Sequence, residues 1–131
     1  PYVHLLGYQS HYVFVEELKK AHIYIQPSVT AQNGDSEGGA PTTLLEAQAS
    51  GIPVVSSYHA DIPEAVINGK SGFLVPERDT NALAERLEYL IAHPEEWSTM
   101  GREGRRHVEM NYNICKEAGN LENIYDALIR K

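Results

Sequence analysis

The 131-residue sequence has one cysteine, no long apolar run and few basic residues. Cys115 alone excludes an internal disulfide and is typical of a protein from a reducing compartment. No apolar run reaches the length of a membrane-spanning helix, and no signal peptide is recognisable. The net charge is −7, which disfavours the phosphate contacts of a nucleic-acid-binding protein.

The shortage of basic residues is greatest between Lys20 and Lys70, where the chain has neither Lys nor Arg. The length predicts one domain with its own hydrophobic core. Because the chain begins with Pro1 rather than Met and runs directly into strand-like sequence, we expect it to be a piece of a longer protein.

Short apolar segments alternate with amphipathic ones along the chain. They predict strands at residues 3–7, 21–25, 53–57 and 72–75, and helices at 12–20, 41–50, 61–66, 79–93, 94–110 and 114–130. This alternation favours an α/β fold: a Rossmann-like, three-layer arrangement of a parallel sheet with helices on both faces, followed by C-terminal helices.

Two carboxylates mark the region where such a sheet binds its ligand. The loop of residues 28–40 leaves the carboxyl end of a strand, which is where open α/β sheets bind ligands, and it carries Glu37. Glu46 follows in the next helix and shares a face with Thr42 and Thr43. A lone pair of glutamates is more often solvated than functional, so the surrounding sequence decides.

The start of this helix offers backbone donors. The amides of Ala40, Thr42 and Thr43 lack intrahelical partners, and the helix dipole there favours an anion. Gly38 and Gly39 permit a left-handed backbone and the close approach of a ligand. Amides that suit a phosphate and carboxylates that suit hydroxyls together favour a nucleotide-sugar.

The other face of the same helix is expected to pack on the sheet. It carries Leu45 and Ala49, with Leu44 and Ala47 nearby.

Two stretches of the chain resemble the signature of the group 1 (family 4) glycosyltransferases. The first runs from Asp35-Ser36-Glu37-Gly38-Gly39-Ala40-Pro41 through Glu46-Ala47 to Gly51-Ile52-Pro53-Val54-Val55. The second is Asp61-Ile62-Pro63-Glu64-Ala65-Val66-Ile67-Asn68-Gly69-Lys70-Ser71-Gly72-Phe73-Leu74-Val75-Pro76. The resemblance covers most of residues 3–92, in order and at sensible spacing.

The resemblance implies half of a GT-B architecture. Residues 1–131 would be a partial C-terminal nucleotide-sugar-binding domain, and the N-terminal acceptor domain would be absent. The parent enzyme, of hexosyltransferase type, would transfer a sugar from a nucleotide-diphosphate-sugar to an acceptor with retention of configuration. No metal or cofactor is expected. The fragment alone is expected to be inactive.

The resemblance also implies roles for individual residues. Glu37 would be the catalytic residue, contacting the donor sugar near the reaction centre, and Glu46 would accept hydrogen bonds from the ribose hydroxyls. The implied donor-binding residues are Gly38, Gly39, Ala40, Thr42, Thr43 and Glu46.

The chain departs from the family pattern in two places. Eight residues separate Glu37 from Glu46, where the family has seven. Tyr58-His59-Ala60 stands where the family often has a glycine pair.

The expected partners are a nucleotide-sugar and a sugar or lipid-linked acceptor, without nucleic acid, in the cytoplasm. A peripheral contact with the inner face of the membrane is an alternative, because Arg102, Arg105 and Arg106 line one helix face. A solvated surface is the competing interpretation of that cluster. The donor base, the sugar, the acceptor and the oligomeric state are not determined by the sequence.

Two other functions stay open. A nucleotide-sugar epimerase of similar fold would need acid–base side chains, for which His59 and the carboxylates are the candidates. A degenerate, non-catalytic transferase module is the second alternative. Gly69-Lys70-Ser71 is not a P-loop, because a strand follows it, and His59 with Asp61 is only half a metal site. Tyr8 either contacts a base or packs.

Overall fold

The computed structural model describes residues 2–36 and 38–129 of the chain. Its described part contains a three-stranded parallel sheet in the order β1 (Tyr24–Gln26), β2 (Val54–Ser57) and β3 (Gly72–Val75). In the centre of the sheet, Val55 pairs with Ile25 on one side and with Phe73 on the other. The predicted α/β fold with a parallel sheet is confirmed.

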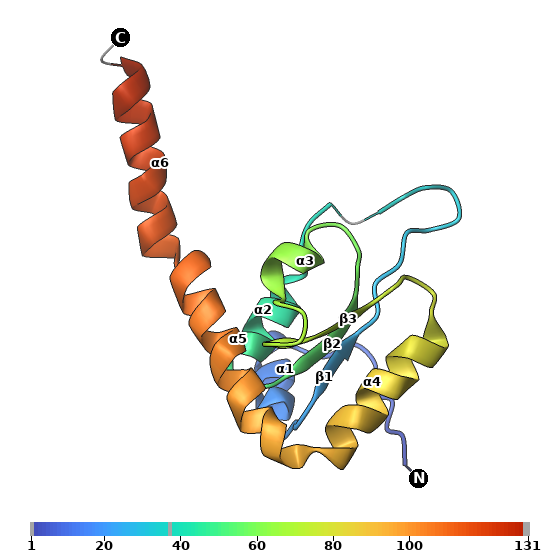
Figure 1. Ribbon diagram of the computed structural model, residues 1–131. Coiled ribbons are helices and arrows are strands. Elements are labelled where there is room, and N and C mark those ends of the chain that lie inside the picture. The colour runs from blue at the N-terminus through green and yellow to red at the C-terminus, as the bar shows by residue number, and fades with distance from the viewer. Residues whose placement is uncertain (1, 37, 130–131) are drawn as a thin grey trace.

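Helices cover both faces of the sheet, as the sequence predicts. Figure 1 shows α2 on one face and α4 on the other, and these helices contact the strands between them. The C-terminal helix α6 extends away from the rest of the chain (Figure 1). The helical elements are α1 (His11–Leu18), α2 (Thr42–Ala49), α3 (Ile62–Ala65), α4 (Thr80–Ala92), the 3₁₀ turn η1 (Pro94–Glu96), α5 (Trp97–Asn111) and α6 (Ile114–Ile129).

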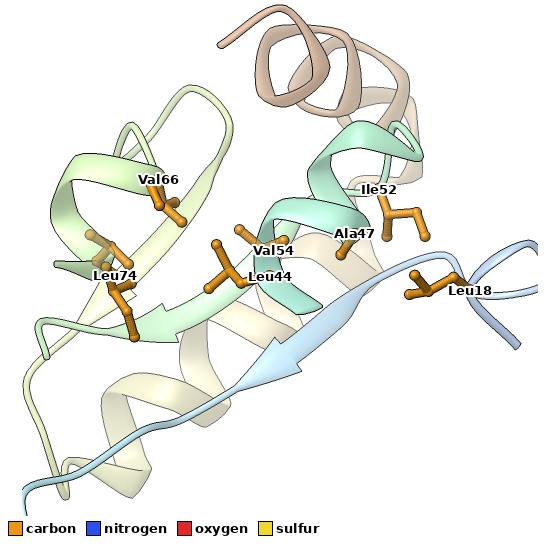
Figure 2. Packing of buried hydrophobic residues seen from close by; sticks show 9 residues of the cluster. Leu18, Leu44, Ala47, Ile52, Val54, Val66 and Leu74 are labelled. Carbon is orange, nitrogen blue, oxygen red and sulfur yellow. The ribbon is translucent and has the colours of Figure 1, made fainter. Parts of the chain in front are cut away.

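The hydrophobic core has one cluster on each face of the sheet. Successive residues of a strand point to opposite faces, so Val54 joins one cluster and Val55 joins the other. Figure 2 shows the larger cluster, in which α2 packs its Leu44 and Ala47 against the sheet. Phe73, Leu90 and Met100 complete the smaller one.

Residues 3–7 do not form the predicted strand. Their apolar side chains are exposed, with Leu5 at 94% and Leu6 at 55%. A strand persists only where a neighbouring strand accepts its hydrogen bonds. Residues 3–7 pair with none of the three strands in the described part of the chain. The apolar pattern of residues 3–7 is typical of a strand, but it does not show whether a neighbouring strand is available for pairing.

The buried face of α2 also differs from the prediction. Leu44 and Ala47 are fully buried and Leu45 is half-buried, whereas Ala49 is exposed. The reason is a second neighbour: α5 packs on α2 and buries the side chain of Gln48 as well. Helical periodicity alone does not reveal on which side a later helix will lie.

The carboxyl ends of the three strands meet at one edge of the sheet. Side chains of β2 hold the end of β1 in place there. The Ser56 hydroxyl donates to the Gln26 carbonyl at 2.6 Å, and the Ser57 hydroxyl donates to the carbonyl of Ser28. The loops that follow the strands leave this edge and carry the candidate site. Their described residues are 27–36 and 38–41, 58–61 and 76–79.

Candidate functional site

The start of α2 presents unsatisfied backbone donors. The first turn of α2 is closed by the Leu44 amide, which donates to the Pro41 carbonyl at 3.0 Å. Within the described part of the chain, the amides of Ala40, Thr42 and Thr43 have no acceptor, and Pro41 provides no side-chain cap. An open helix start of this kind attracts anions.

Glu46 lies one turn into α2 and is partly exposed, at 36%. Its Oε1 accepts a hydrogen bond from Nε2 of His11 at 2.7 Å, which ties the start of α1 to α2. Burial first, and then the Glu46 charge, raise the pKa of the Tyr24 hydroxyl. The Thr43 hydroxyl donates to Oε1 of Gln26 at 3.0 Å, so Thr43 offers its amide rather than its hydroxyl to a ligand.

Gly39, just before α2, does not use the left-handed backbone that a glycine permits. In the described part of the chain, positive φ values at glycine occur at Gly7, Gly34, Gly51 and Gly69. A Cβ built on Gly38 or Gly39 meets nothing within 4 Å. The packing of the chain therefore does not require glycine at these two positions, and open space surrounds them.

The other candidate residues have distinct environments. Ala40 is half-buried and packs against the larger core cluster, and Thr42 is exposed. Glu37, the predicted catalytic residue, lies outside the described residues, and its role stays a prediction.

A second group of polar side chains joins the three loops at the carboxyl edge. His59 follows β2 and is only 4% exposed, and its Nδ1 lies 2.7 Å from Oε1 of Glu77, which follows β3. Glu77 also accepts hydrogen bonds from the Thr30 amide at 2.8 Å and the Thr30 hydroxyl at 3.1 Å. The Thr30 amide, followed by the His59 hydrogen bond, lowers the pKa of the Glu77 carboxyl.

Sequence reasoning considered His59 but missed Glu77. A carboxylate two residues past a strand's carboxyl end was the available signal, but it does not identify the partner. The Thr30–Glu77 contact spans 47 residues of sequence, and only the parallel sheet brings the two together.

A hollow of about 340 Å³ opens beside His59. Its other lining residues come from the loop after β1, on the segment that leads to position 37: Ser28, Val29, Ala31, Asp35 and Ser36. This volume is within the range of about 300–1,000 Å³ that is common for small-molecule sites.

The arginines of α5 are less available than the sequence suggests. Arg102 donates to the hydroxyls of Ser98 and Thr99, and Nε of Arg105 pairs with Glu109 at 2.8 Å. Tyr8 is fully exposed. In residues 2–36 and 38–129, no helix is long and apolar enough to cross a membrane, and no three His, Cys, Asp or Glu residues gather as metal ligands.

Comparisons with known proteins place this arrangement among sugar transferases. The model of the family described as glycosyl transferases group 1 matches residues 2–107. The chain is 40% identical over 111 residues to the amylovoran biosynthesis glycosyltransferase AmsK of Erwinia amylovora, covering 85% of this chain. It is 34% identical over 116 residues to the GDP-mannose-dependent alpha-(1-6)-phosphatidylinositol monomannoside mannosyltransferase of Mycolicibacterium smegmatis, covering 82% of this chain.

A solved structure gives the same result for the fold. The sucrose-phosphate synthase of Thermosynechococcus elongatus matches 95% of this chain with a TM-score of 0.80 and 27% sequence identity. The match covers 30% of the synthase chain, and this chain spans 27% of the Erwinia protein and 30% of the Mycolicibacterium protein.

Proposed function

The chain belongs to the group 1 glycosyltransferases, and on that premise we propose that it is part of the C-terminal, nucleotide-sugar-binding domain of a longer enzyme. The enzyme transfers a sugar from a nucleotide-diphosphate-sugar to an acceptor and retains the anomeric configuration. An N-terminal domain outside this chain supplies the acceptor site. No metal takes part.

The observation that carries the proposal is the open start of α2 at the carboxyl edge of the sheet. The free amides of Thr42 and Thr43 suit the diphosphate, and the Glu46 carboxylate one turn away suits paired ribose hydroxyls. Open space at Gly38 and Gly39 lets the ligand approach the backbone between them.

The same groups support a mechanism. As the bond between the sugar and the diphosphate breaks, negative charge grows on the leaving phosphate. Amides that already point at it stabilise this charge without reorganising. Glu37 positions the donor sugar at the reaction centre, and the acceptor arrives on the face from which the diphosphate departs.

The relatives support the class of donor. The Mycolicibacterium relative is named as GDP-mannose-dependent, so a nucleotide-diphosphate-hexose is the donor class that we propose here. Its name also includes a phosphatidylinositol mannoside, which supports a lipid-linked acceptor and a peripheral contact with the cytoplasmic face of a membrane. Within the described part, Arg102 and Arg106 of α5 are exposed and form no ion pair, and Arg106 also forms no side-chain hydrogen bond.

A donor screen on the full-length protein tests the proposal. We expect one of UDP-glucose, GDP-mannose and ADP-glucose to raise the thermal unfolding midpoint selectively. Incubation of that donor with an acceptor extract should then yield a new glycosidic bond. A free sugar epimer as product would favour the epimerase instead, and the absence of any donor-specific shift would favour a non-catalytic module.

A further inference from the structure

The contact between His59 and Glu77 determines which ring nitrogen of His59 carries a proton. An ionised carboxylate only accepts hydrogen bonds, so Nδ1 is the protonated nitrogen that donates to Glu77. Glu77 is kept ionised by the Thr30 amide and by this same hydrogen bond, both of which lower its carboxyl pKa. The ring is therefore held in one orientation, with Nε2 on its far side.

Nε2 of His59 is left for a ligand. No group in the described residues hydrogen-bonds to it. His59 lines the 340 Å³ hollow, and Nε2 is the ring nitrogen that is not already held by Glu77.

The chemistry of the hollow favours a neutral, hydroxyl-rich group over an anion. Its described lining contains the Asp35 carboxylate and two serines beside His59, and neither Lys nor Arg. A carboxylate repels phosphate but accepts hydrogen bonds from hydroxyls. A neutral imidazole with Nδ1 protonated likewise accepts at Nε2.

We propose that the hollow holds the sugar of the nucleotide-sugar donor, with His59 accepting a hydrogen bond from a sugar hydroxyl at Nε2. Glu77 is a positioning residue that fixes the His59 ring, and Thr30 anchors Glu77 in turn. This inference rests on the proposed function and deepens it, because it assigns recognition of the sugar to a loop pair separate from the start of α2. The diphosphate remains assigned to the amides of Thr42 and Thr43, and the ribose remains assigned to Glu46.

The test compares nucleotide-sugars with the matching nucleotides. In the full-length protein, calorimetric titration would use UDP-glucose, GDP-mannose and ADP-glucose beside UDP, GDP and ADP. We expect His59→Ala to lower the affinity for the preferred nucleotide-sugar by about 3- to 10-fold, which corresponds to the loss of one neutral hydrogen bond. Affinity for the nucleotide alone should be unchanged.

His93→Ala is the matched control. His93 is half-buried and its Nδ1 contacts the Tyr89 carbonyl at 2.7 Å, far from the carboxyl edge at the end of α4. Replacing His93 also removes a histidine whose Nδ1 is hydrogen-bonded. We expect the affinities for the nucleotide and for the nucleotide-sugar to stay at the wild-type values.

The test of Glu77 must distinguish an effect on the position of the His59 ring from an effect on folding. Glu77→Ala should raise KM for the donor while kcat changes little, and Glu77→Gln should restore most of the KM, because its amide oxygen still accepts from Nδ1. A purely structural role would instead give Glu77→Ala and Glu77→Gln the same KM for the donor, whatever their loss of thermal stability.

Two results would overturn the assignment. One is unchanged binding of the nucleotide-sugar by His59→Ala. The other is an equal loss of nucleotide and nucleotide-sugar binding, which would show that His59 only supports the fold. If the wild-type protein binds none of the six probes, the proposed function itself fails and the assignment fails with it.

Discussion

At the scale of single residues, the roles proposed for Glu46 and His59 can be tested separately. Glu46 lies beside the open helix start and is partly exposed, while the nearly buried His59 faces a hollow bounded by other loops. Replacing Glu46 should therefore affect every ligand that contains ribose, whereas replacing His59 should affect only those that contain the sugar.

Glu46→Gln removes the charge but keeps a similar shape. Hydrogen bonds to a charged group are worth about 1.5–3 kcal/mol, so we expect the affinities for nucleotide and nucleotide-sugar to fall together, by at least tenfold. His11→Ala is the control, because it removes the exposed contact with Glu46 and a ring contact with Phe14, and exposed pairs contribute about 0–1 kcal/mol. Calorimetric titration of both variants measures the difference, and retention of wild-type nucleotide affinity by Glu46→Gln would contradict the ribose contact.

A substitution at Gly39 tests whether a ligand occupies the open space before α2. A Cβ at this position meets nothing within 4 Å and φ is not positive, so Gly39→Ala should leave the unfolding midpoint within error of the wild type. We expect donor affinity to fall by about tenfold, because the methyl group occupies space that the ligand needs. Thermal unfolding with and without donor measures both effects, and unchanged donor binding would show that the ligand passes elsewhere.

At the scale of elements, the packing of α5 on α2 depends on two glycines. A Cβ on Gly101 would lie 1.9 Å from the Gly51 carbonyl oxygen, which belongs to the backbone just after α2. A Cβ on Gly104 would lie 3.1–3.3 Å from Oε1, Cγ and Cβ of Gln48, which are side-chain atoms. Backbone atoms cannot rotate away from an added methyl group, whereas side-chain atoms can.

Gly101→Ala should accordingly destabilise the fold far more than Gly104→Ala. We expect a loss of about 2 kcal/mol or more for Gly101→Ala, since overpacking must push α5 away from α2, and less than about 1 kcal/mol for Gly104→Ala. Urea denaturation followed by circular dichroism measures both changes. Equal losses in the two variants would mean that α5 is not fixed against α2 as described.

The Glu77 carboxylate links the loops after the three strands, and this link depends on pH. Its pKa is lowered on folding by the Thr30 amide and by His59, so the ionised form favours the folded state. The stabilisation is complete above about pH 4.5, the ordinary value, and is lost as the pH falls through the lower pKa of the folded state. Other carboxylates titrate too, so the informative quantity is the difference between two variants.

We expect the wild type to be more stable than Glu77→Gln at pH 7, with the difference narrowing below about pH 4.5. Urea denaturation of both proteins across this range measures it. A difference that stays constant with pH would show that Glu77 acts through its shape and not through its charge.

Local signals in the sequence predicted the helices and strands better than they predicted contacts between residues that are distant in the sequence. Pro41 and Gly51 bracket a helix that the structure confirms as α2, and the alternation of segments correctly predicted a parallel sheet. Residues 3–7 failed as a strand because pairing depends on a distant partner. The Thr30–Glu77 contact was not predictable for the same reason, since it forms only once β1 and β3 share a sheet.

At the scale of the whole molecule, the chain exposes apolar surface at both ends of its described part. Tyr2, Val3, Leu5 and Leu6 are exposed near the N-terminal end. Along α6, apolar side chains at helical spacing are at least half exposed: Leu121, Ile124, Tyr125 and Leu128.

The distribution of charge leads to the last prediction, which concerns the 131-residue chain alone. A nucleotide-diphosphate needs positive counter-charge, and neither Lys nor Arg lies between Lys20 and Lys70, around the open start of α2. The amides of Thr42 and Thr43 are neutral dipoles that help an anion without balancing its charge.

We therefore expect the isolated chain to bind the preferred nucleotide-sugar at least tenfold more weakly than the full-length protein, and to show no turnover. The reason is that the chain spans 27–30% of the length of its relatives, so the remaining length is available to supply basic residues and an acceptor site. Parallel titrations and product assays of the two proteins, with circular dichroism to verify that the short chain is folded, measure this. Measurable sugar transfer by the folded 131-residue chain would mean that its own helix start and loops are sufficient for catalysis.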